Sequence, residues 1–472
     1  MLKFEKFLSS NYYICLVFII AFLTWSFQGN NVDAITFGTL NLIGTFIIAL
    51  FVTALLILQK NTIYVIPPLI SLLFVVNNSQ ISFDTLNQFG LPFIFLFVVL
   101  SGPIIYMIRF KPKFKIKALT LGLFLIALAY VIPLLFTSWS LKGFMISIVG
   151  FLYFGFYLFF SNTVKGNMDY LMKIMMIINI LIFAQFNYKV LDAFHTYPEL
   201  SIVEQFTQGI QSGWYSNFGW ANINDITFYV VLTMPSFVYF IFKHPKKIFF
   251  WFLLFIPVYV ILFSGSRGAL IGFLIATIGL GIIILIKGKA YHYIHLAILL
   301  VLGIVVVIFT KDIIINALRV TLDTFSGGTI SSISSGRIYI YYQGLNVFKE
   351  NPIFGASWLA VDQIGFAGRI FMFHSTIIQV LATMGLFGLL ALLVHYFQIF
   401  KMFYTNFTFE KQLILIGYIA TQMHGLIDNV QFSVPYSFII VILFPIIENA
   451  VKPTIFKKEN GKYVYHDITL PI

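Results

Sequence analysis

The sequence predicts an all-α polytopic integral membrane protein. Hydrophobic residues make up 60% of the 472 residues, charged residues only 10%, and the mean hydropathy is +0.95. This composition excludes an ordinary soluble domain. Apolar runs of about 20 residues recur along the chain, and this is the length that an α-helix needs to cross a bilayer. The single cysteine, Cys15, excludes an internal disulfide framework and a thiolate metal centre.

The apolar runs predict about 14 transmembrane helices, of which 62–77 has the weakest pattern. The first is expected to be retained, because no small-residue cleavage site follows it. The predicted ranges are 12–28, 36–58, 62–77, 89–108, 118–136, 143–160, 170–187, 225–242, 248–263, 267–286, 292–309, 374–400, 411–427 and 433–449.

The basic residues predict the orientation of these helices. With a cytoplasmic N-terminus, 21 of the 29 basic residues fall on the cytoplasmic side, as the positive-inside rule requires. Both termini are then expected in the cytoplasm. Lysines that face an anionic leaflet explain the net charge of +12, so no nucleic-acid partner is expected.

Two outer segments, about 188–224 and 310–373, are long enough to hold a site, and such long connections are usually functional or disordered. The apolar stretch "RIYIYYQGLNVFK" favours order in the second. The expected divisions are N-terminal transmembrane helices (1–187), an outer loop plus transmembrane helices with the SGSRG motif (188–309), an extracytoplasmic loop bearing short helices (310–373), C-terminal transmembrane helices (374–450) and a cytoplasmic tail (451–472).

The arginines are distributed against the topology rule. Of the five, Arg109 alone lies on the inner side, and the others lie outside: Arg267, Arg319, Arg337 and Arg369. A guanidinium binds carboxylate or phosphate oxygens through two N–H groups at once, which an ammonium cannot do. We therefore expect anion binding at the outer face.

The stretch "FSGSRGALIGF" (263–273) places a turn before an outward-facing helix start at Arg267. A helix N-terminus offers unpaired N–H groups and a partial positive charge, so it favours an anion such as a phosphate. Ser264 and Ser266 are expected to add hydroxyl donors to this site. The alternative is that Arg267 only anchors its helix at the interface.

The segment "SSGRIYIYYQGLNVFKENPIFG" predicts a capped helix of about three turns on the membrane face, with Arg337 in its first turn. Arg337 is expected to close on the same anion. His374 stands at the outer entrance of the next membrane helix, where a neutral imidazole can take a proton from a hydroxyl. The alternative is a polar boundary residue. A hydrogen-bonded couple of His424 and Asp428 is a minor candidate.

Other chemistry is not indicated by the sequence. No His, Cys or carboxylate spacing suggests a metal centre, and no GxSxG, P-loop or GxGxxG motif is present.

Three segments, "SGSRGALIGF", "SSGRIYIYYQGLNVFKENPIFG" and "FHSTIIQVLATMGLFGLL", closely resemble in order and rough spacing the signature segments of the O-antigen ligase and polymerase superfamily. Upstream, "FGWANINDITFYVVLTMP" is similar to the asparagine-containing stretch of that family. The resemblance covers about 200–396, and the N-terminal helices are matched by hydropathy only. One departure is His374-Ser375, where the family often has His-Asn.

The resemblance implies a metal-independent, cofactor-free glycosyltransferase of the GT-C type in the bacterial cytoplasmic membrane, with an extracytoplasmic active site. Its donor and acceptor would be undecaprenyl-pyrophosphate-linked oligosaccharides. His374 would be the base, and Arg267 and Arg337 would hold the pyrophosphate. Substrate binding is also expected at Ser264, Ser266, Asn222, Asn224, Arg319 and Arg369, the two asparagines having helix capping as an alternative. Outer aromatic side chains would stack on sugars or form the interfacial belt: Trp214, Tyr215, Trp220, Tyr339, Tyr341, Tyr342 and Trp358.

Three functions remain open from the sequence. The first is a polysaccharide polymerase, and the excess of lysine over arginine, 24 to 5, suggests an AT-rich genome and a capsule. A chain-length regulator protein is a plausible partner of such an enzyme. The second is a ligase that transfers a finished glycan to another acceptor. The third is a flippase or transporter for lipid-linked oligosaccharides, which should show related halves and charges inside its helices.

Overall fold

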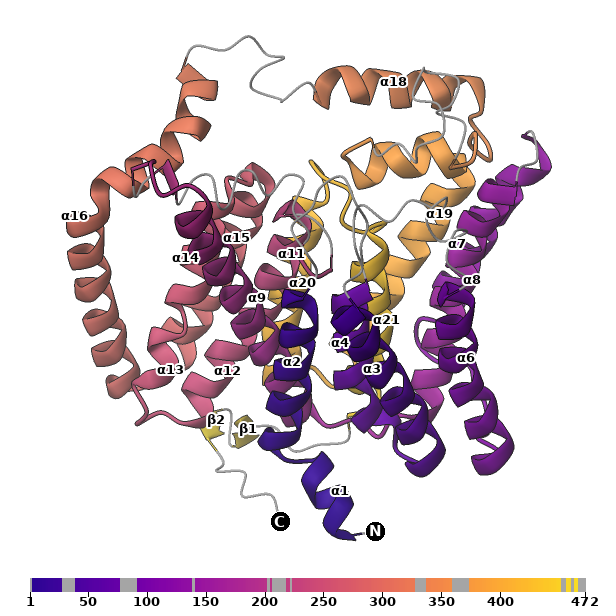
Figure 1. Ribbon diagram of the computed structural model, residues 1–472, viewed down its shortest axis with the longest axis horizontal. Coiled ribbons are helices and arrows are strands. Elements are labelled where there is room, and N and C mark those ends of the chain that lie inside the picture. The colour runs from indigo at the N-terminus through magenta and orange to yellow at the C-terminus, as the bar shows by residue number, and fades with distance from the viewer. Residues whose placement is uncertain are drawn as a thin grey trace.

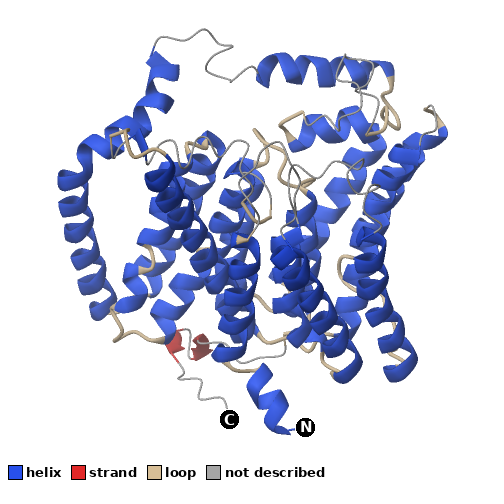
Figure 2. Ribbon diagram, viewed as in Figure 1, coloured by secondary structure: helices blue, strands red, loops and turns tan. Residues whose placement is uncertain are grey.

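The computed structural model describes residues 2–27, 39–76, 91–137, 141–201, 204–205, 218–220, 223–326, 337–358, 373–450, 456–459 and 462–465. Helices dominate this part of the chain, and one short hairpin follows the last helix (Figure 1, Figure 2). The first half contains α1 (Leu2–Leu8), α2 (Asn11–Ser26), α3 (Thr39–Leu58), η1 (Thr62–Val65), α4 (Ile66–Val76), α6 (Leu91–Phe110), α7 (Thr120–Val131), η2 (Ile132–Leu135), α8 (Leu141–Thr163) and α9 (Met168–Thr196). The second half contains α11 (Ile223–Thr233), α12 (Pro235–Lys243), α13 (Phe249–Phe252), α14 (Phe255–Ser264), α15 (Arg267–Lys287), α16 (Ala290–Ser326), α18 (Arg337–Glu350), α19 (Thr376–Tyr404), α20 (Phe409–His424), α21 (Val434–Glu448), β1 (Phe456–Glu459) and β2 (Lys462–Tyr465).

Every predicted membrane helix overlaps a helix or a pair of consecutive helices in the structure. Among the described residues, six helices are long and apolar enough to span a bilayer by length and composition, and several other apolar helices are shorter. The predicted class, an all-α polytopic membrane protein, is therefore confirmed. The expected total of about 14 crossings stays a prediction.

Two helices continue further than the hydropathy pattern predicts. α9 extends to Thr196, and α16 extends to Ser326, so the expected 310–373 loop begins as helix. In 310–326 the residues become more polar, but apolar residues continue at helical spacing. The end of an apolar run therefore marks where membrane burial is expected to stop, and it does not mark where the helix stops.

The helices differ greatly in burial. The segment Ile223–Lys243, formed by α11 and α12, is 94% buried in its apolar window, whereas the corresponding window of α16 is 0% buried. α11 packs against α9, α14, α15 and α20, while α16 stands at the edge of the molecule (Figure 1). An all-round apolar helix is stable in the centre of a bundle or in lipid. These two helices illustrate both environments.

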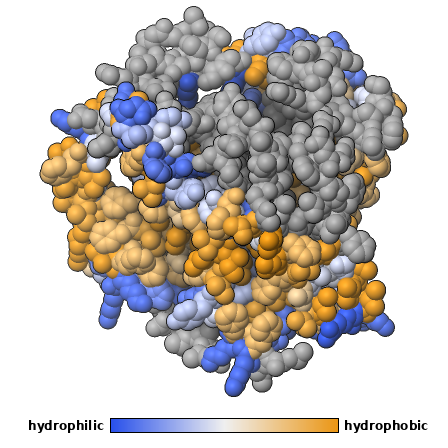
Figure 3. All heavy atoms as spheres, in the orientation of Figure 1, coloured by the Kyte–Doolittle hydropathy of each residue, from blue (hydrophilic) through white to orange (hydrophobic). Residues whose placement is uncertain are grey.

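The two ends of the molecule are distinguished by their elements. α1 and the β1–β2 hairpin lie at one end, and α18 lies at the opposite end (Figure 1). The Tyr170 hydroxyl at the start of α9 donates to the Leu8 carbonyl oxygen at 3.2 Å, which places the start of α9 at the α1 end. On the visible surface, apolar residues gather in a belt between polar regions (Figure 3). This is the arrangement expected around a bilayer.

A break inside α19 fixes the position of α18. Gly385 has φ 64°, and the backbone groups that the break exposes are satisfied by the segment after α18. The Leu386 N–H donates to the Pro352 carbonyl at 2.9 Å, and the Ala356 N–H donates to the Ala382 carbonyl at 2.9 Å. A Cβ at Gly385 would lie 2.5 Å from the Ile353 carbonyl oxygen, so this close approach requires glycine. The 351–358 segment thus holds α18 beside the start of α19.

Candidate active site

Arg337 and His374 are brought together by the packing of α18 on α19. α18 begins at Arg337, as the sequence predicts for the first turn of a helix. Gly344 allows the close contact, because a Cβ there would lie 2.4 Å from Ile378 and 2.9 Å from Phe373. The start of α18 therefore lies over the segment that leads into α19.

His374 is held in a constrained backbone conformation just before α19. Its φ is 47°, in the left-handed region that non-glycine residues seldom adopt. The Tyr341 hydroxyl of α18 donates to its carbonyl oxygen at 3.0 Å. On either side, the Phe373 N–H donates to Gln379 Oε1 at 2.9 Å, and the Thr376 N–H donates to the Gly425 carbonyl at 2.9 Å. Such an over-determined outlier is typical of functional sites.

The turn after α20 carries a carboxylate into the same place. The N–H groups of Ile427 and Asp428 both donate to the His424 carbonyl at 3.1 Å, which folds this turn back on the helix end. The Asn429 N–H donates to Asp428 Oδ1 at 2.8 Å, and the Asn429 side-chain amide donates to Gln379 Oε1 at 3.0 Å. Gln379 therefore links the turn to α19 and to the segment that carries His374.

Asp428 joins the histidine and the arginine. Its Oδ1 lies 3.2 Å from His374 Nδ1, and its Oδ2 lies 3.3 Å from an Arg337 guanidinium nitrogen. The other terminal nitrogen of Arg337 donates to the Ile427 carbonyl. The Asp428 side chain is 12% exposed, that of Arg337 23% and that of His374 40%. The carboxylate is thus enclosed, while the imidazole opens to the outside.

The electrostatics keep Asp428 ionised. Burial by itself would raise the pKa of the carboxyl, but the hydrogen bond with His374 and the charge of Arg337 lower this pKa to about 2. A carboxylate can only accept hydrogen bonds, so the proton between them sits on His374 Nδ1. The Nε2 atom of a neutral His374 then carries a lone pair. This is the orientation that a general base needs.

The start of α15 adjoins the opposite side of this turn. Gly265 has φ 64°, and the Ser266 hydroxyl accepts from the Ala269 N–H at 3.4 Å as the helix cap. A Cβ at Gly268 would lie 2.3 Å from His424 Nε2, so α15 touches the end of α20 beside its own first residue, Arg267. Arg267 is half-buried. The α15 N-terminus and the Asp428 turn therefore meet through His424.

The two predicted serines form the turn, as expected, and both are buried. The Ser264 hydroxyl donates to the Ile261 carbonyl at 2.8 Å and accepts from the Ser266 N–H at 3.2 Å. The Ser266 hydroxyl accepts from the helix, as described. These hydrogen bonds shape the α15 N-terminus. Donation from the two hydroxyls to a substrate stays a prediction.

Of the remaining predicted substrate-binding residues, the structure describes Asn224 and the backbone of Arg319. Asn224 lies in the first turn of α11, four residues before Phe228, whose ring packs 4.6 Å from that of His424. Since residues four apart share a helix face, Asn224 lies on the face that leads to the site. Arg319 belongs to α16, where its side chain is not described, and Asn222 and Arg369 lie outside the described residues.

The structure corrects two expectations about His424 and the outer aromatic residues. Within the described residues, the ring nitrogens of His424 have no hydrogen-bond partner, because Asp428 turns to His374 and Arg337 instead. Trp220 and Trp358 are buried among protein side chains, so they neither face a sugar nor form the interfacial belt. The Trp220 indole N–H donates to the Ile70 carbonyl at 3.2 Å, and Trp358 stacks on Tyr130. Trp214 and Tyr215 lie outside the described residues, while Tyr339 and Tyr342 are exposed.

Asp428 is the residue whose role sequence reasoning missed. The sequence does place an aspartate directly after a predicted membrane helix. Because Asp428 follows His424 by four residues, however, the sequence favoured His424 as its hydrogen-bond partner, which is wrong. Within the described chain, no group of three or more His, Cys, Asp or Glu side chains could hold a metal ion. The arrangement instead offers an oriented imidazole, a paired guanidinium and a nearby helix N-terminus. It suits proton abstraction from a hydroxyl next to a bound anion.

Residues 252–393 match the sequence model of the family described as O-antigen ligase. The resemblance of the three motifs is therefore confirmed over this part of the chain, which includes Arg267, Arg337 and His374. Asp428 lies beyond the matched residues. The comparison with curated proteins gives no match. The match covers less than a third of the chain and does not separate a polymerase from a ligase.

Proposed function

We propose that this protein is a polysaccharide polymerase acting at the extracytoplasmic face of the bacterial cytoplasmic membrane. A growing glycan leaves undecaprenyl pyrophosphate and is transferred to a hydroxyl of the next lipid-linked repeat unit. The family match and the membrane-spanning helices support this class of reaction. The position of the site at the α18 end, opposite α1, supports an extracytoplasmic location (Figure 1).

In this mechanism His374 is the general base. Its Nε2 takes the proton of the acceptor hydroxyl while the acceptor oxygen bonds to the anomeric carbon of the donor. The bond between that carbon and the pyrophosphate oxygen breaks, and undecaprenyl pyrophosphate leaves with the electron pair. Asp428 holds the imidazole in position and stabilises the imidazolium that forms.

The leaving pyrophosphate is assigned to the arginines and to the α15 N-terminus. Arg267 stands at the first residue of that helix, where backbone N–H groups and the helix dipole favour an anion. Arg337 uses two nitrogens on Asp428 and Ile427, and a guanidinium has further N–H groups for a phosphate oxygen. Fixed cations at this place stabilise the charge that develops on the leaving group.

One observation carries the proposal: a single carboxylate, Asp428, contacts both the candidate base and one of the candidate phosphate-binding arginines. A histidine that served only as a polar boundary residue would need neither partner. The second candidate function is a ligase that delivers a finished glycan to a different acceptor. The description of the matching family favours it, and the same residues would perform the same bond changes.

The test is a gel of the glycan products formed by detergent-purified protein and the undecaprenyl-pyrophosphate-linked repeat unit from the same operon. We expect a ladder with the unmodified protein and with His195→Ala, and no ladder with His374→Ala. His195 is an exposed control at the end of α9. A ladder from His374→Ala would remove this residue as the base.

Two further outcomes of the same experiment distinguish a ligase and a transporter from a polymerase. If the unmodified protein makes no ladder but transfers the glycan once a second acceptor is added, the protein is a ligase. If it transfers glycan under neither condition but moves the lipid-linked unit across proteoliposome membranes, a transporter replaces both enzymatic functions.

A further inference from the structure

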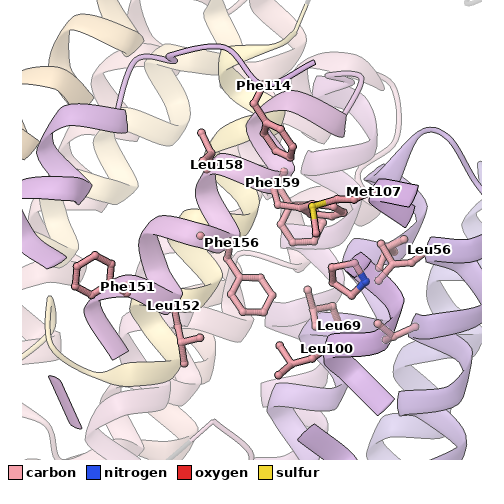
Figure 4. Close-up of a pocket in the computed structure, with 15 residues that line it drawn as sticks. Leu56, Leu69, Leu100, Met107, Phe114, Phe151, Leu152, Phe156, Leu158 and Phe159 are labelled. Atoms are coloured by element: carbon pink, nitrogen blue, oxygen red, sulfur yellow. The ribbon is translucent and has the colours of Figure 1, made fainter. Parts of the chain in front are cut away.

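A second feature lies away from the candidate active site: an apolar cavity of about 420 Å³ between α3, α4, α6 and α8 (Figure 4). All 15 residues that line it are apolar, and Figure 4 shows Leu56, Met107, Phe114 and Phe159 around the space. This volume falls in the range of ligand pockets in proteins. An apolar cavity without polar groups to orient a ligand suits a hydrocarbon chain.

The cavity opens at the surface of the helix bundle. Its inner wall is buried and includes Leu56, Val65 and Phe160, whereas Met107 and Phe151 on its outer wall are exposed. The exposed residues belong to the sides of α6 and α8, and both helices are apolar along their length. A ligand can therefore enter sideways from the surrounding lipid, without passing through water.

A basic segment forms one end of the cavity. In "RFKPKFKIK" (109–117), lysines alternate with other residues; Phe114 lines the cavity, and Phe114, Lys111, Lys113 and Lys115 are all exposed. The Lys115 N–H donates to Asn162 Oδ1 at 2.8 Å, so hydrogen bonding to the end of α8 fixes this segment. Lys113 and Lys115 are the sequence neighbours of Phe114, which lines the cavity, so a short run of exposed lysines adjoins this apolar space.

Contacts with the last helix place this basic segment at the α1 end of the molecule. The Lys117 ammonium donates to Asn449 Oδ1 at 2.8 Å, and a bridge joins Gly166 to Ala450. Asn449 follows α21, and Gly166 lies two residues before the start of α9, which contacts α1. The cavity is thus at the end opposite α18, away from the candidate active site.

We propose that this cavity and its lysine rim bind an anionic phospholipid of the adjacent leaflet. One acyl chain occupies the space between α3, α4, α6 and α8, and the phosphate of the headgroup lies against Lys111, Lys113 and Lys115. The charge complementarity between lysine and phosphate selects an anionic lipid, and the apolar lining selects a chain. This inference goes beyond the proposed function and does not depend on it.

Native mass spectrometry of the detergent-purified full chain tests the proposal. Phosphatidylglycerol and phosphatidylcholine with the same acyl chains are titrated separately, and the occupancy of the first bound lipid is compared. We expect phosphatidylglycerol to bind about tenfold more tightly. The triple variant Lys111→Gln, Lys113→Gln, Lys115→Gln should bind both lipids equally, whereas Lys246→Gln, Lys247→Gln, Lys401→Gln should keep the preference. These control lysines are also exposed, and the charge change is the same.

A second variant tests the cavity itself. Gly155 lines the cavity, and a Cβ there would meet no atom within 4 Å, so Gly155→Leu adds a side chain at an open place in the cavity wall. It should weaken the binding of both lipids about tenfold. Gly281→Leu is the matched control, because Gly281 of α15 has the same open surroundings and lies outside the cavity.

Three results would overturn the proposal. The first is unchanged phosphatidylglycerol binding in Gly155→Leu, and the second is an unchanged lipid preference in the lysine variant. The third is displacement of phosphatidylglycerol by stoichiometric undecaprenyl phosphate, which would assign the cavity to a polyprenyl chain. Because none of these measurements uses glycan transfer, a failure here leaves the proposed enzymatic function untouched.

Discussion

The two ends of the molecule hold their cations in different ways. At the α18 end, Arg337 contacts a carboxylate and a backbone carbonyl, so its guanidinium has one orientation. At the α1 end, Lys111, Lys113 and Lys115 are exposed on the segment between α6 and α7, and among the described residues they form no ion pair with a carboxylate. The planar guanidinium of arginine binds an anion in a defined orientation, whereas exposed ammonium groups contribute mainly positive charge. We therefore expect anion binding at the α18 end to depend on the orientation of the cation, and anion binding at the α1 end to depend on the net positive charge.

The largest effect is expected from Asp428→Asn. An amide of the same shape no longer carries the charge that orients His374 and pairs with Arg337, so we expect the initial rate of glycan transfer to fall about 10³-fold. The rate is measured with the lipid-linked repeat unit, and lipid binding to the protein serves as the folding control. Asp225→Asn, in the first turn of α11, tests whether any outer aspartate has this effect. Equal losses in the two variants would contradict the assigned role.

Acid stability examines the same carboxylate. Its pKa of about 2 in the folded protein lies below the value of about 3.9 for an unfolded aspartate, so its contribution to stability is present above pH 4. That contribution is lost as the pH falls through about 4 toward 2. Thermal unfolding between pH 2 and 5 should therefore show a steeper decline for the unmodified protein than for Asp428→Asn. Parallel pH curves would show that the carboxylate is not stabilised by folding.

Arg337→Lys tests whether glycan transfer needs the planar guanidinium of this residue or only its positive charge. The ammonium keeps the positive charge but loses the planar fork, so we expect glycan transfer to slow by about 10²-fold. The same exchange at the lysine end, Arg109→Lys, should leave the transfer rate within about twofold, because that end needs only charge. Comparable rates for the two variants would remove the distinction between the ends.

Gly385→Ala tests the support of the arginine end. The added Cβ would approach the Ile353 carbonyl oxygen, and the residue would keep a positive φ, which together should lower the free energy of unfolding by about 1–3 kcal/mol. Thermal unfolding in detergent measures this loss. Gly281→Ala serves as the control, since nothing lies within 4 Å of its Cβ. An unchanged midpoint for Gly385→Ala would mean that the break in α19 relaxes at no cost.

The smallest effect is expected from the triple variant Lys111→Gln, Lys113→Gln, Lys115→Gln on catalysis. In neutral detergent, without anionic lipid, its transfer rate should stay within about twofold of the unmodified rate, because these exposed charges are at the opposite end from the reaction. The rate is measured with the same lipid-linked substrate. A large loss under these conditions would mean that the lysine end participates directly in transfer.

Much of the fold could be predicted because hydropathy is a local property. Runs of apolar residues located the helices, and the start of α18 at Arg337 and the turn before α15 agree with the expected helix starts. The predictions failed where a helix continues beyond the apolar run that marks the expected membrane span, as α16 does to Ser326. They also failed at Trp220 and Trp358, because an aromatic residue near an interface has no sequence mark that separates burial in protein from exposure.

The sequence alone determined the class of protein and located the motif residues Arg267, Arg337 and His374, since each follows from composition or from a short stretch of chain. Only the tertiary structure decided that Asp428 contacts His374 and Arg337 instead of His424. The three residues come from α18, the segment before α19 and the turn after α20, and their contacts depend on the break at Gly385 and the hydrogen bonds of Gln379. Contacts of this kind depend on how distant elements pack, and no local pattern in the sequence specifies that packing.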